Sequence, residues 1–298
     1  MRKILLSIVA CSTLLTVGAQ EVEVVKREQL LKGVESIAYY PVLSEDGEKV
    51  VFSTSNYEGL KLYDFKNDVV IKISDAERAG LYPKISEDGV VYYVTQKRVG
   101  ALNYRNLESY DLSSGVNSVI VEGERSVKAP QLIKGGVAVK SSKGMSQTAS
   151  SVEPTIYVDG STIVIAANGK ERILSPIESE AGYVWASLSP DATKILFVAA
   201  GKGMFIIDLT GNILAEFAEY QAPVWYGNDY VVAQNATDDG HQFSSSQIVM
   251  LKGDGSYIKE LTTPTSMAMY PTASADANKV IYSTIDGKLY MMEISVVE

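Results

Sequence analysis

The chain alternates short apolar runs with turn-forming residues, and one form of this alternation recurs. The recurring unit is an eight-residue segment, and each copy of this segment is followed by an apolar run rich in β-branched and aromatic residues, which is typical of a buried strand. Weaker copies begin at Ala129-Pro130 and Ala222-Pro223. The four clear copies share the order aromatic, Pro or Ala, two residues, Ser, one residue, Asp, Gly or Ala, and they are residues 40–47, 82–89, 185–192 and 270–277.

The spacing of these copies predicts a propeller. The six Pro-equivalent positions run from 41 to 271 in five intervals, a mean spacing of about 46 residues. A period of 40 to 50 residues built from short strands and turns is typical of β-propellers, in which each blade has four strands. We therefore expect an all-β fold, a six-bladed β-propeller over residues 21–298. Two β-sandwiches would not repeat one motif at one period, and a seven-bladed ring would need one more copy than the sequence shows.

The two ends of the chain are expected to share a blade. The last unit ends at Glu298, just after its third strand, so it lacks an outer strand. Residues 21–31 are β-rich, and Leu31 lies nine residues before Tyr40, as Ile73 lies before Tyr82. This N-terminal strand therefore completes the sixth blade and closes the ring, which removes a sheet edge.

Composition limits the chemistry of the site. The 298 residues include one Cys and one His, which excludes zinc centres built on several of either residue. A formal net charge of −9 gives no electrostatic reason to bind a nucleic-acid backbone. We expect no cofactor, no metal and no nucleic-acid partner.

The first 20 residues have the pattern of a secretory signal. Arg2 and Lys3 precede an apolar run from Ile4 to Val17, and small residues follow, so we expect cleavage near Ala19. The run is too short to span a bilayer. The alternative is a lipid anchor at Cys11, which the shortness of the run before Cys11 disfavours. The protein is therefore expected in the periplasm, with outer-membrane or cell-surface association as a further possibility.

The repeat resembles that of a known family. The best copies of the turn are Ser44-Glu45-Asp46-Gly47, Ser86-Glu87-Asp88-Gly89 and Ser189-Pro190-Asp191. With the strands that follow, they resemble the WD-repeat-like propeller of the TolB family and of peptidase-associated propellers, over residues 21–298. Similarity to TolB implies a periplasmic, protein-binding role near the outer membrane. This sequence lacks the separate α/β domain that precedes the propeller in TolB.

One face of such a propeller carries its variable loops, namely the turns between strands two and three and the connections between blades. We expect a binding surface there, at the mouth of the central channel. The polar tract 141–154 is interpreted as a mobile surface loop or a flap over that channel. The segment 235–246 is interpreted as a solvated loop, with a cation site or a nucleophile–base pair as alternatives. The candidate partner-binding residues are Asn56, Tyr57, Lys97, Arg98, Ser142, Lys143, Met145, Lys202, Asp238, Asp239 and His241.

These features favour a non-catalytic interaction module of the cell envelope, whose partner is an envelope protein or peptide segment. The alternative is a propeller that binds a glycan or small molecule, and a hydrolase-type enzyme comes third. No Gly-x-Ser-x-Gly elbow is present. Asp64, Asp111 and Asp208 recur at one place in the third strand, which indicates a role in building blades. The aromatic residues of the repeat, Tyr40, Tyr82, Trp185 and Tyr270, are expected to pack between blades.

Overall fold

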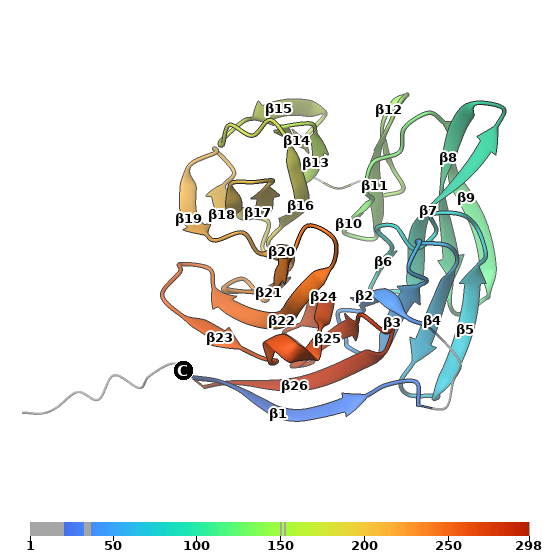
Figure 1. Cartoon of the computed structure of the whole chain (residues 1–298). Coiled ribbons are helices and arrows are strands. Elements are labelled where there is room, and N and C mark those ends of the chain that lie inside the picture. Colours follow the sequence, from blue (N-terminus) through green and yellow to red (C-terminus); the bar gives the residue numbers. More distant parts are fainter. Residues whose placement is uncertain (1–20, 33–36, 150, 152, 298) are drawn as a thin grey trace, which may run out of the picture.

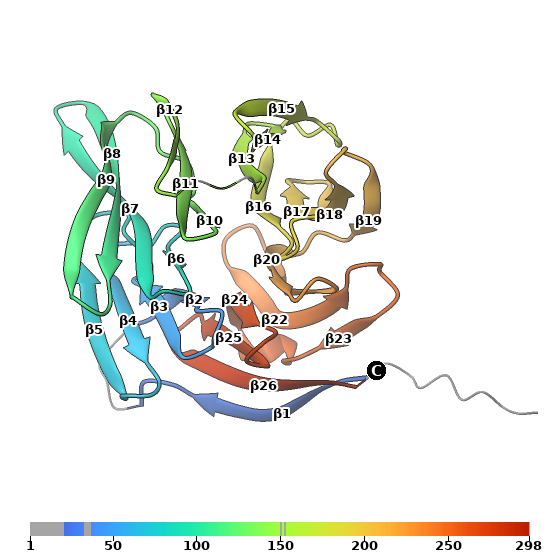
Figure 2. The same cartoon turned by 180° about the vertical axis from the view of Figure 1, so that it is seen from behind.

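The protein is a β-propeller with seven blades. A computed structural model describes residues 21–32, 37–149, 151 and 153–297, so the expected signal sequence and Cys11 lie outside the described residues. The described residues form seven antiparallel sheets, which are arranged in a ring. Figure 1 shows the ring along its axis, and Figure 2 shows it from behind. The all-β propeller is confirmed, whereas the expected count of six blades is wrong.

Four blades consist of four strands that pair in chain order, from the centre of the ring to its edge (Figure 1). Blade 1 comprises β2 (Tyr39–Leu43), β3 (Lys49–Ser53), β4 (Leu60–Asp64) and β5 (Val69–Ser74); blade 2 comprises β6 (Lys84–Ile85), β7 (Val90–Val99), β8 (Leu102–Asp111) and β9 (Val116–Glu124). Blade 5 comprises β16 (Tyr183–Leu188), β17 (Lys194–Ala199), β18 (Gly203–Asp208) and β19 (Ile213–Phe217); blade 6 comprises β20 (Gln221–Tyr226), β21 (Tyr230–Asp238), β22 (Phe243–Lys252) and β23 (Ile258–Glu260).

Blades 3 and 4 explain the wrong count. The segment 131–174, expected to hold one blade with a long loop, holds two sheets of three strands each. Residues 144–147 of the tract 141–154 are not a surface loop or a flap, because they form the third strand of blade 3 and pair with β11. Without fourth strands, two blades fit into the length of one. Blade 3 comprises β10 (Gln131–Ile133), β11 (Gly136–Ser141) and β12 (Gly144–Gln147); blade 4 comprises β13 (Thr155–Asp159), β14 (Thr162–Ala167) and β15 (Lys170–Leu174).

The N-terminal strand closes the ring, as expected. β1 (Glu21–Gln29) pairs antiparallel with β26 (Leu289–Val297) and forms the outer strand of blade 7. The two strands run side by side along the edge of the molecule in both views (Figures 1 and 2). The inner strands of this blade are β24 (Ala268–Ser274) and β25 (Lys279–Thr284), which follow a short 3₁₀ helix, η1 (Pro264–Ser266).

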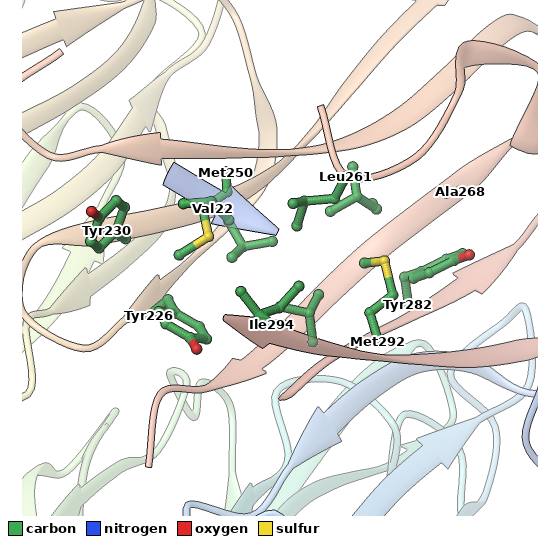
Figure 3. Close-up of a cluster of buried hydrophobic side chains, with 12 residues drawn as sticks. Val22, Tyr226, Tyr230, Met250, Leu261, Ala268, Tyr282, Met292 and Ile294 are labelled. Atoms are coloured by element: carbon green, nitrogen blue, oxygen red, sulfur yellow. The ribbon is translucent and has the colours of Figure 1, made fainter. Parts of the chain in front are cut away.

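Hydrophobic clusters between neighbouring blades form the core. The largest lies between blades 6 and 7 and includes Val22 of β1, which is fully buried. Figure 3 shows Val22 among side chains such as Met250 of blade 6 and Ile294 of blade 7. The backbone N–H of Val22 also donates to the Tyr257 hydroxyl at 3.1 Å. The first described strand is thus joined both to blade 7 and to the blade beside it.

The seam between blades 3 and 4 is different, because it is polar. None of the six hydrophobic clusters of the described residues joins these two blades. Instead, the Gln131 amide accepts from the Ile156 N–H at 2.8 Å and donates to the Ile156 carbonyl, as a neighbouring strand would. Lys140 reaches across to Glu171 at 2.7 Å, and its ammonium lies 5.2 Å from the centre of the Tyr157 ring.

We predict that Val22→Ala destabilises the whole ring. Val22 is fully buried, so truncation removes apolar contacts in the cluster between blades 6 and 7 and should cost about 2 kcal/mol of unfolding free energy. Urea denaturation measures this loss. Val25 of the same strand is 65% exposed, so Val25→Ala should stay within about 0.5 kcal/mol of wild type. Equal losses in the two variants would show that β1 does not close the ring through Val22.

A second prediction concerns the polar seam. Gln131→Ala leaves both backbone groups of the buried Ile156 without their side-chain partner, which should cost about 1–3 kcal/mol. The control is Gln147→Ala, at an exposed position of the same blade, which should be nearly neutral. Hydrogen exchange at the Ile156 amide should accelerate only in Gln131→Ala. Unchanged exchange there would contradict the assigned role of Gln131.

Candidate functional site: an aromatic rim at one end of the channel

The turns between strands two and three share one face of the ring with the connections between blades. Antiparallel pairing places the end of every second strand and the end of every fourth strand on the same side. Hydrogen bonds join the two kinds of segment directly. In blade 1, Gly80 of the connection to blade 2 donates to the Tyr57 carbonyl of the β3–β4 turn at 3.1 Å. In blade 5 the direction is reversed, as Ala200 of the β17–β18 turn donates to the Gly182 carbonyl of the connection from blade 4 at 3.1 Å.

All eleven candidate partner-binding residues lie on this face or on the strands that lead to it, but they come from five different blades. The structure does not gather them into one site. They are Asn56 and Tyr57 in the β3–β4 turn, Lys97 and Arg98 in β7, Ser142 and Lys143 between β11 and β12, Met145 in β12, Lys202 between β17 and β18, Asp238 at the end of β21, and Asp239 and His241 in the β21–β22 turn.

The β21–β22 turn has its carboxylates committed to its own backbone. Asp238 accepts from the Gly240 N–H at 2.9 Å, and Asp239 accepts from the Gln242 and His241 N–H groups at 2.9 Å each. These backbone donors, with Gln242 the larger contributor, lower the pKa of Asp239. Within the described residues, no three His, Cys, Asp or Glu side chains are grouped so that they could hold a metal ion.

A repeated backbone bulge redirects the aromatic residues of the motif. Tyr40, Trp185 and Tyr270 have left-handed backbones, with φ of 52°, 53° and 52°. Beside each of them the pairing of the innermost strand with the next one shifts register. Such bulges turn a side chain away from the regular pleat. The Tyr270 N–H, which the bulge takes out of the ladder, donates to the side chain of the fully buried Gln234 at 3.1 Å.

The sequence led us to expect that these aromatic rings pack between blades. In the structure, not all of them do. Tyr82, whose backbone is also left-handed with φ of 59°, is 50% exposed. Trp185 is 39% exposed. Tyr40, Trp185 and Tyr270 lie within the first three residues of an innermost strand, and Tyr82 lies two residues before one, so these side chains lie near the channel mouth on the face of the variable loops. We call Tyr40, Tyr57, Tyr82, Trp185 and Tyr270 the aromatic rim.

Three residues of the rim stack on one another across the junction of blades 7 and 1. The Tyr40 and Tyr57 rings are 4.0 Å apart between centroids and nearly parallel, and Tyr270 lies 4.4 Å from Tyr40. The Tyr40 hydroxyl donates to the Ser55 carbonyl at 3.1 Å. Burial, and then the hydrogen bond with Tyr57, raise the pKa of Tyr40 far above its usual value. The Tyr40 phenol is therefore a neutral hydrogen-bonding group at physiological pH.

Two arginines lie beside the rim. Arg78 belongs to the connection between blades 1 and 2 and Arg105 to β8. Burial, and then the nearby Arg78 charge, lower the pKa of Arg105. Burial, and then Tyr57, raise the pKa of Tyr82, whereas Arg78 acts in the opposite direction. Arg78 therefore lies within electrostatic range of both Arg105 and Tyr82. Neither arginine belongs to the repeated motif, so the sequence pattern does not single them out.

The opposite end of the ring carries the short turns between strands one and two. The motif serine and aspartate build these turns, as the Ser44 hydroxyl donates to Asp46 at 2.5 Å and the Ser189 hydroxyl to Asp191 at 2.6 Å. Carboxylates gather here. Burial, followed by the charges of Glu87 and Asp276, raises the pKa of Glu45. Glu45, Glu87 and Asp276 thus lie close together at this end, whereas Arg78 and Arg105 lie toward the other end.

The outer part of blade 2 contains a pocket of about 440 Å³. It opens beside Thr148, where blade 3 has no fourth strand. Its carboxylate, Asp111, accepts from the Ser113 and Ser114 N–H groups at 2.8 and 2.9 Å. These turn contacts, with the Ser113 hydroxyl the largest contributor, lower the pKa of Asp111 to about 2. The pocket therefore offers no carboxylate that exchanges protons at neutral pH.

We predict that Glu45→Gln stabilises the protein at neutral pH. The folded state raises the pKa of Glu45, so its contribution to stability is greatest when it is protonated and declines as the pH rises through that pKa. A glutamine removes this dependence. The melting temperature of the variant should exceed that of wild type at pH 7, and the difference should vanish below about pH 4. Glu48→Gln, in the same turn, is the control. An equal gain in the control would attribute the effect to net charge alone.

Comparisons with known proteins support the fold. No protein-family model matches the sequence, and none of the curated proteins matches it. Among solved structures, a chain of the mitotic checkpoint complex matches with a TM-score of 0.55 and 10% identity, over 98% of each chain. An oligogalacturonate lyase in complex with manganese matches with a TM-score of 0.48 and 10% identity, over 86% of this chain and 76% of that one. The first likeness shows a β-propeller of the WD40-like kind, and the resemblance to TolB stays a prediction.

No helix among the described residues is long and apolar enough to cross a membrane.

Proposed function

We propose that the chain is a non-catalytic interaction module, exported to the periplasm, that binds a segment of an envelope protein at the aromatic rim. The observation that carries this proposal is the repeated left-handed bulge, which directs motif aromatics to the mouth of the channel. Exposed Tyr and Trp side chains are the residues most enriched at the centres of protein interfaces. The apolar pattern of residues 1–20 supports export.

The carboxylates of the third strands support a non-catalytic role. Asp208 accepts from the Thr210 and Asn212 N–H groups at 2.7 and 3.0 Å, and Asp64 accepts from Asn67 at 3.0 Å. Hydrogen bonds, the largest from the Thr210 hydroxyl, hold the pKa of Asp208 far below its usual value. General acid catalysis needs a carboxyl group that is protonated near the working pH, which these groups are not. They end the third strand and begin the turn to the fourth.

A glycan is the second candidate ligand, because Tyr82 and Trp185 expose much of their rings. A sugar stacks best on an open aromatic face. The centroids of the Tyr57 and Tyr270 rings lie 4.0 and 4.4 Å from the centroid of the Tyr40 ring, so these two rings cover Tyr40. This part of the rim therefore presents hydroxyls and ring edges and not an open aromatic face. Hydroxyls and ring edges suit the backbone and side chains of a peptide segment, which favours the protein partner.

We predict that a photo-crosslinking amino acid, p-benzoylphenylalanine, captures the partner when it replaces Tyr82 or Trp185. Irradiation of producing cells should give one discrete adduct of higher mass from each position, because both side chains would touch the bound segment. The matched control is the same replacement at Ile213, which is 47% exposed on the outer strand β19 of blade 5. Ile213 should give no adduct.

Two results would contradict this function. Adducts of equal yield from Ile213 would show collision with abundant proteins, and no adduct from either rim position would show that the rim contacts no protein. In a parallel glycan screen with purified protein, binding that Trp185→Ala abolishes would favour the second candidate.

A further inference from the structure

Arg78 and Arg105 lie near each other, linked through Gln96. Arg105 donates to the Gln96 side chain at 3.3 Å, and the Gln96 backbone N–H donates at 2.9 Å to the carbonyl of Glu77, the residue before Arg78. Among the residues that the structure describes, neither guanidinium has a carboxylate within ion-pair distance, although the chain has 36 acidic and 27 basic residues. Two carboxylates of this region have other side-chain partners. Glu124, opposite Arg105 in the β8–β9 register, is paired with Lys143 at 2.5 Å. Glu77, the neighbour of Arg78 in the chain, accepts from the Gln96 amide at 2.6 Å.

The Arg78 side chain has unused hydrogen-bonding capacity. Its Nε atom is buried and has no hydrogen-bond partner among the described residues. A buried N–H without an acceptor is unfavourable, and so is a second positive charge nearby. Arg105 is only partly engaged, since its Nε donates to the Gln96 side chain at 3.3 Å. An anion placed between the two guanidiniums would relieve both penalties.

The position of the pair connects it to the rim. Arg78 belongs to the connection between blades 1 and 2, which hydrogen-bonds to the turn that contains Tyr57. Four residues after Arg78, the same connection carries the exposed Tyr82. We infer that Arg78 and Arg105 are the anion subsite of the aromatic rim, and that the bound protein segment is acidic and places a carboxylate there. Guanidinium groups match the planar, two-oxygen geometry of carboxylates. This inference rests on the proposed binding function.

A peptide carboxylate fits better than a uronic acid at this place. The Tyr40 and Tyr57 rings are stacked at 4.0 Å, so each covers a face of the other on which a sugar would otherwise stack. The Tyr40 hydroxyl already donates to the Ser55 carbonyl, so it can serve a peptide as the acceptor of a backbone N–H. In this arrangement the two arginines bind an acidic side chain of the partner, and the aromatic rim contacts the partner residues on either side of it.

The test is fluorescence anisotropy of purified protein with a fluorescein-labelled hexaglutamate peptide. Arg78→Gln and Arg105→Gln should each weaken binding about ten-fold, because each removes one charge-assisted contact. Lys170→Gln removes the same charge from the same face in blade 4, at the exposed start of β15, and should change the affinity less than two-fold. Hexalysine should not bind. A uronic-acid trisaccharide and inorganic phosphate should compete only weakly.

Thermal melting separates a ligand role from a structural one. If the arginines serve a ligand, the free protein does not need them, and neither variant should lower the melting temperature by more than about 2 °C. A larger loss in both variants would overturn the inference, as would wild-type affinity in both, no binding of hexaglutamate to wild type, or tighter binding of the trisaccharide or of phosphate. The rim crosslinks distinguish the two proposals. Adducts that persist in Arg78→Gln and Arg105→Gln would overturn the anion subsite alone, whereas no adduct in wild type would overturn the binding function.

Discussion

The antiparallel pairing of β1 with β26 is the constraint on which the rest of the ring depends. A propeller blade is stable because a neighbour covers each of its faces, and only a closed ring gives every blade two neighbours. Here the two ends of the chain meet in one sheet. Blade 7 is then held to blade 1 by further bonds, such as Leu43 N–H to the Thr272 hydroxyl at 3.0 Å and Lys279 to the Gly47 carbonyl at 2.8 Å. The channel mouth exists only while this closure holds.

The ring distributes its stabilising contacts unevenly. Six junctions have hydrophobic clusters, whereas the junction of blades 3 and 4 depends on Gln131 and on ion pairs. Partly exposed ion pairs contribute little to stability, so the amide that imitates a strand is the main specific contact of this seam. Local opening should therefore begin there, because the lowest-stability parts of a fold are those with few buried apolar contacts.

The sequence pattern predicted the features that depend on residues close together in the chain. It did not predict those that depend on packing between blades. The Ser-x-Asp turn was readable because Ser44 and Asp46 bond within four residues of each other. Blades 3 and 4 lack this motif, since their first two strands join through tight turns at Lys134-Gly135 and Gly160-Ser161. Because these two blades lack fourth strands, together they occupy about the length expected of one blade, so the spacing of the motif gave no sign of a seventh blade. The rim aromatics were identified, but their left-handed backbones, which expose them, have no signature in the sequence. Arg78 and Arg105 come together only because two blades pack.

The channel has a direction that follows from these placements. Glu45, Glu87 and Asp276 lie close together at the end with the short turns, and the repulsion between them raises the pKa of Glu45 beyond the effect of its burial. An acidic segment would be repelled at that end, and also by the net charge of −9. The arginine pair is the local exception, and it lies at the end where the bulges expose the aromatic rings. The two arginines and the exposed aromatic rings thus lie toward the same mouth, the one at which we propose that an acidic segment binds.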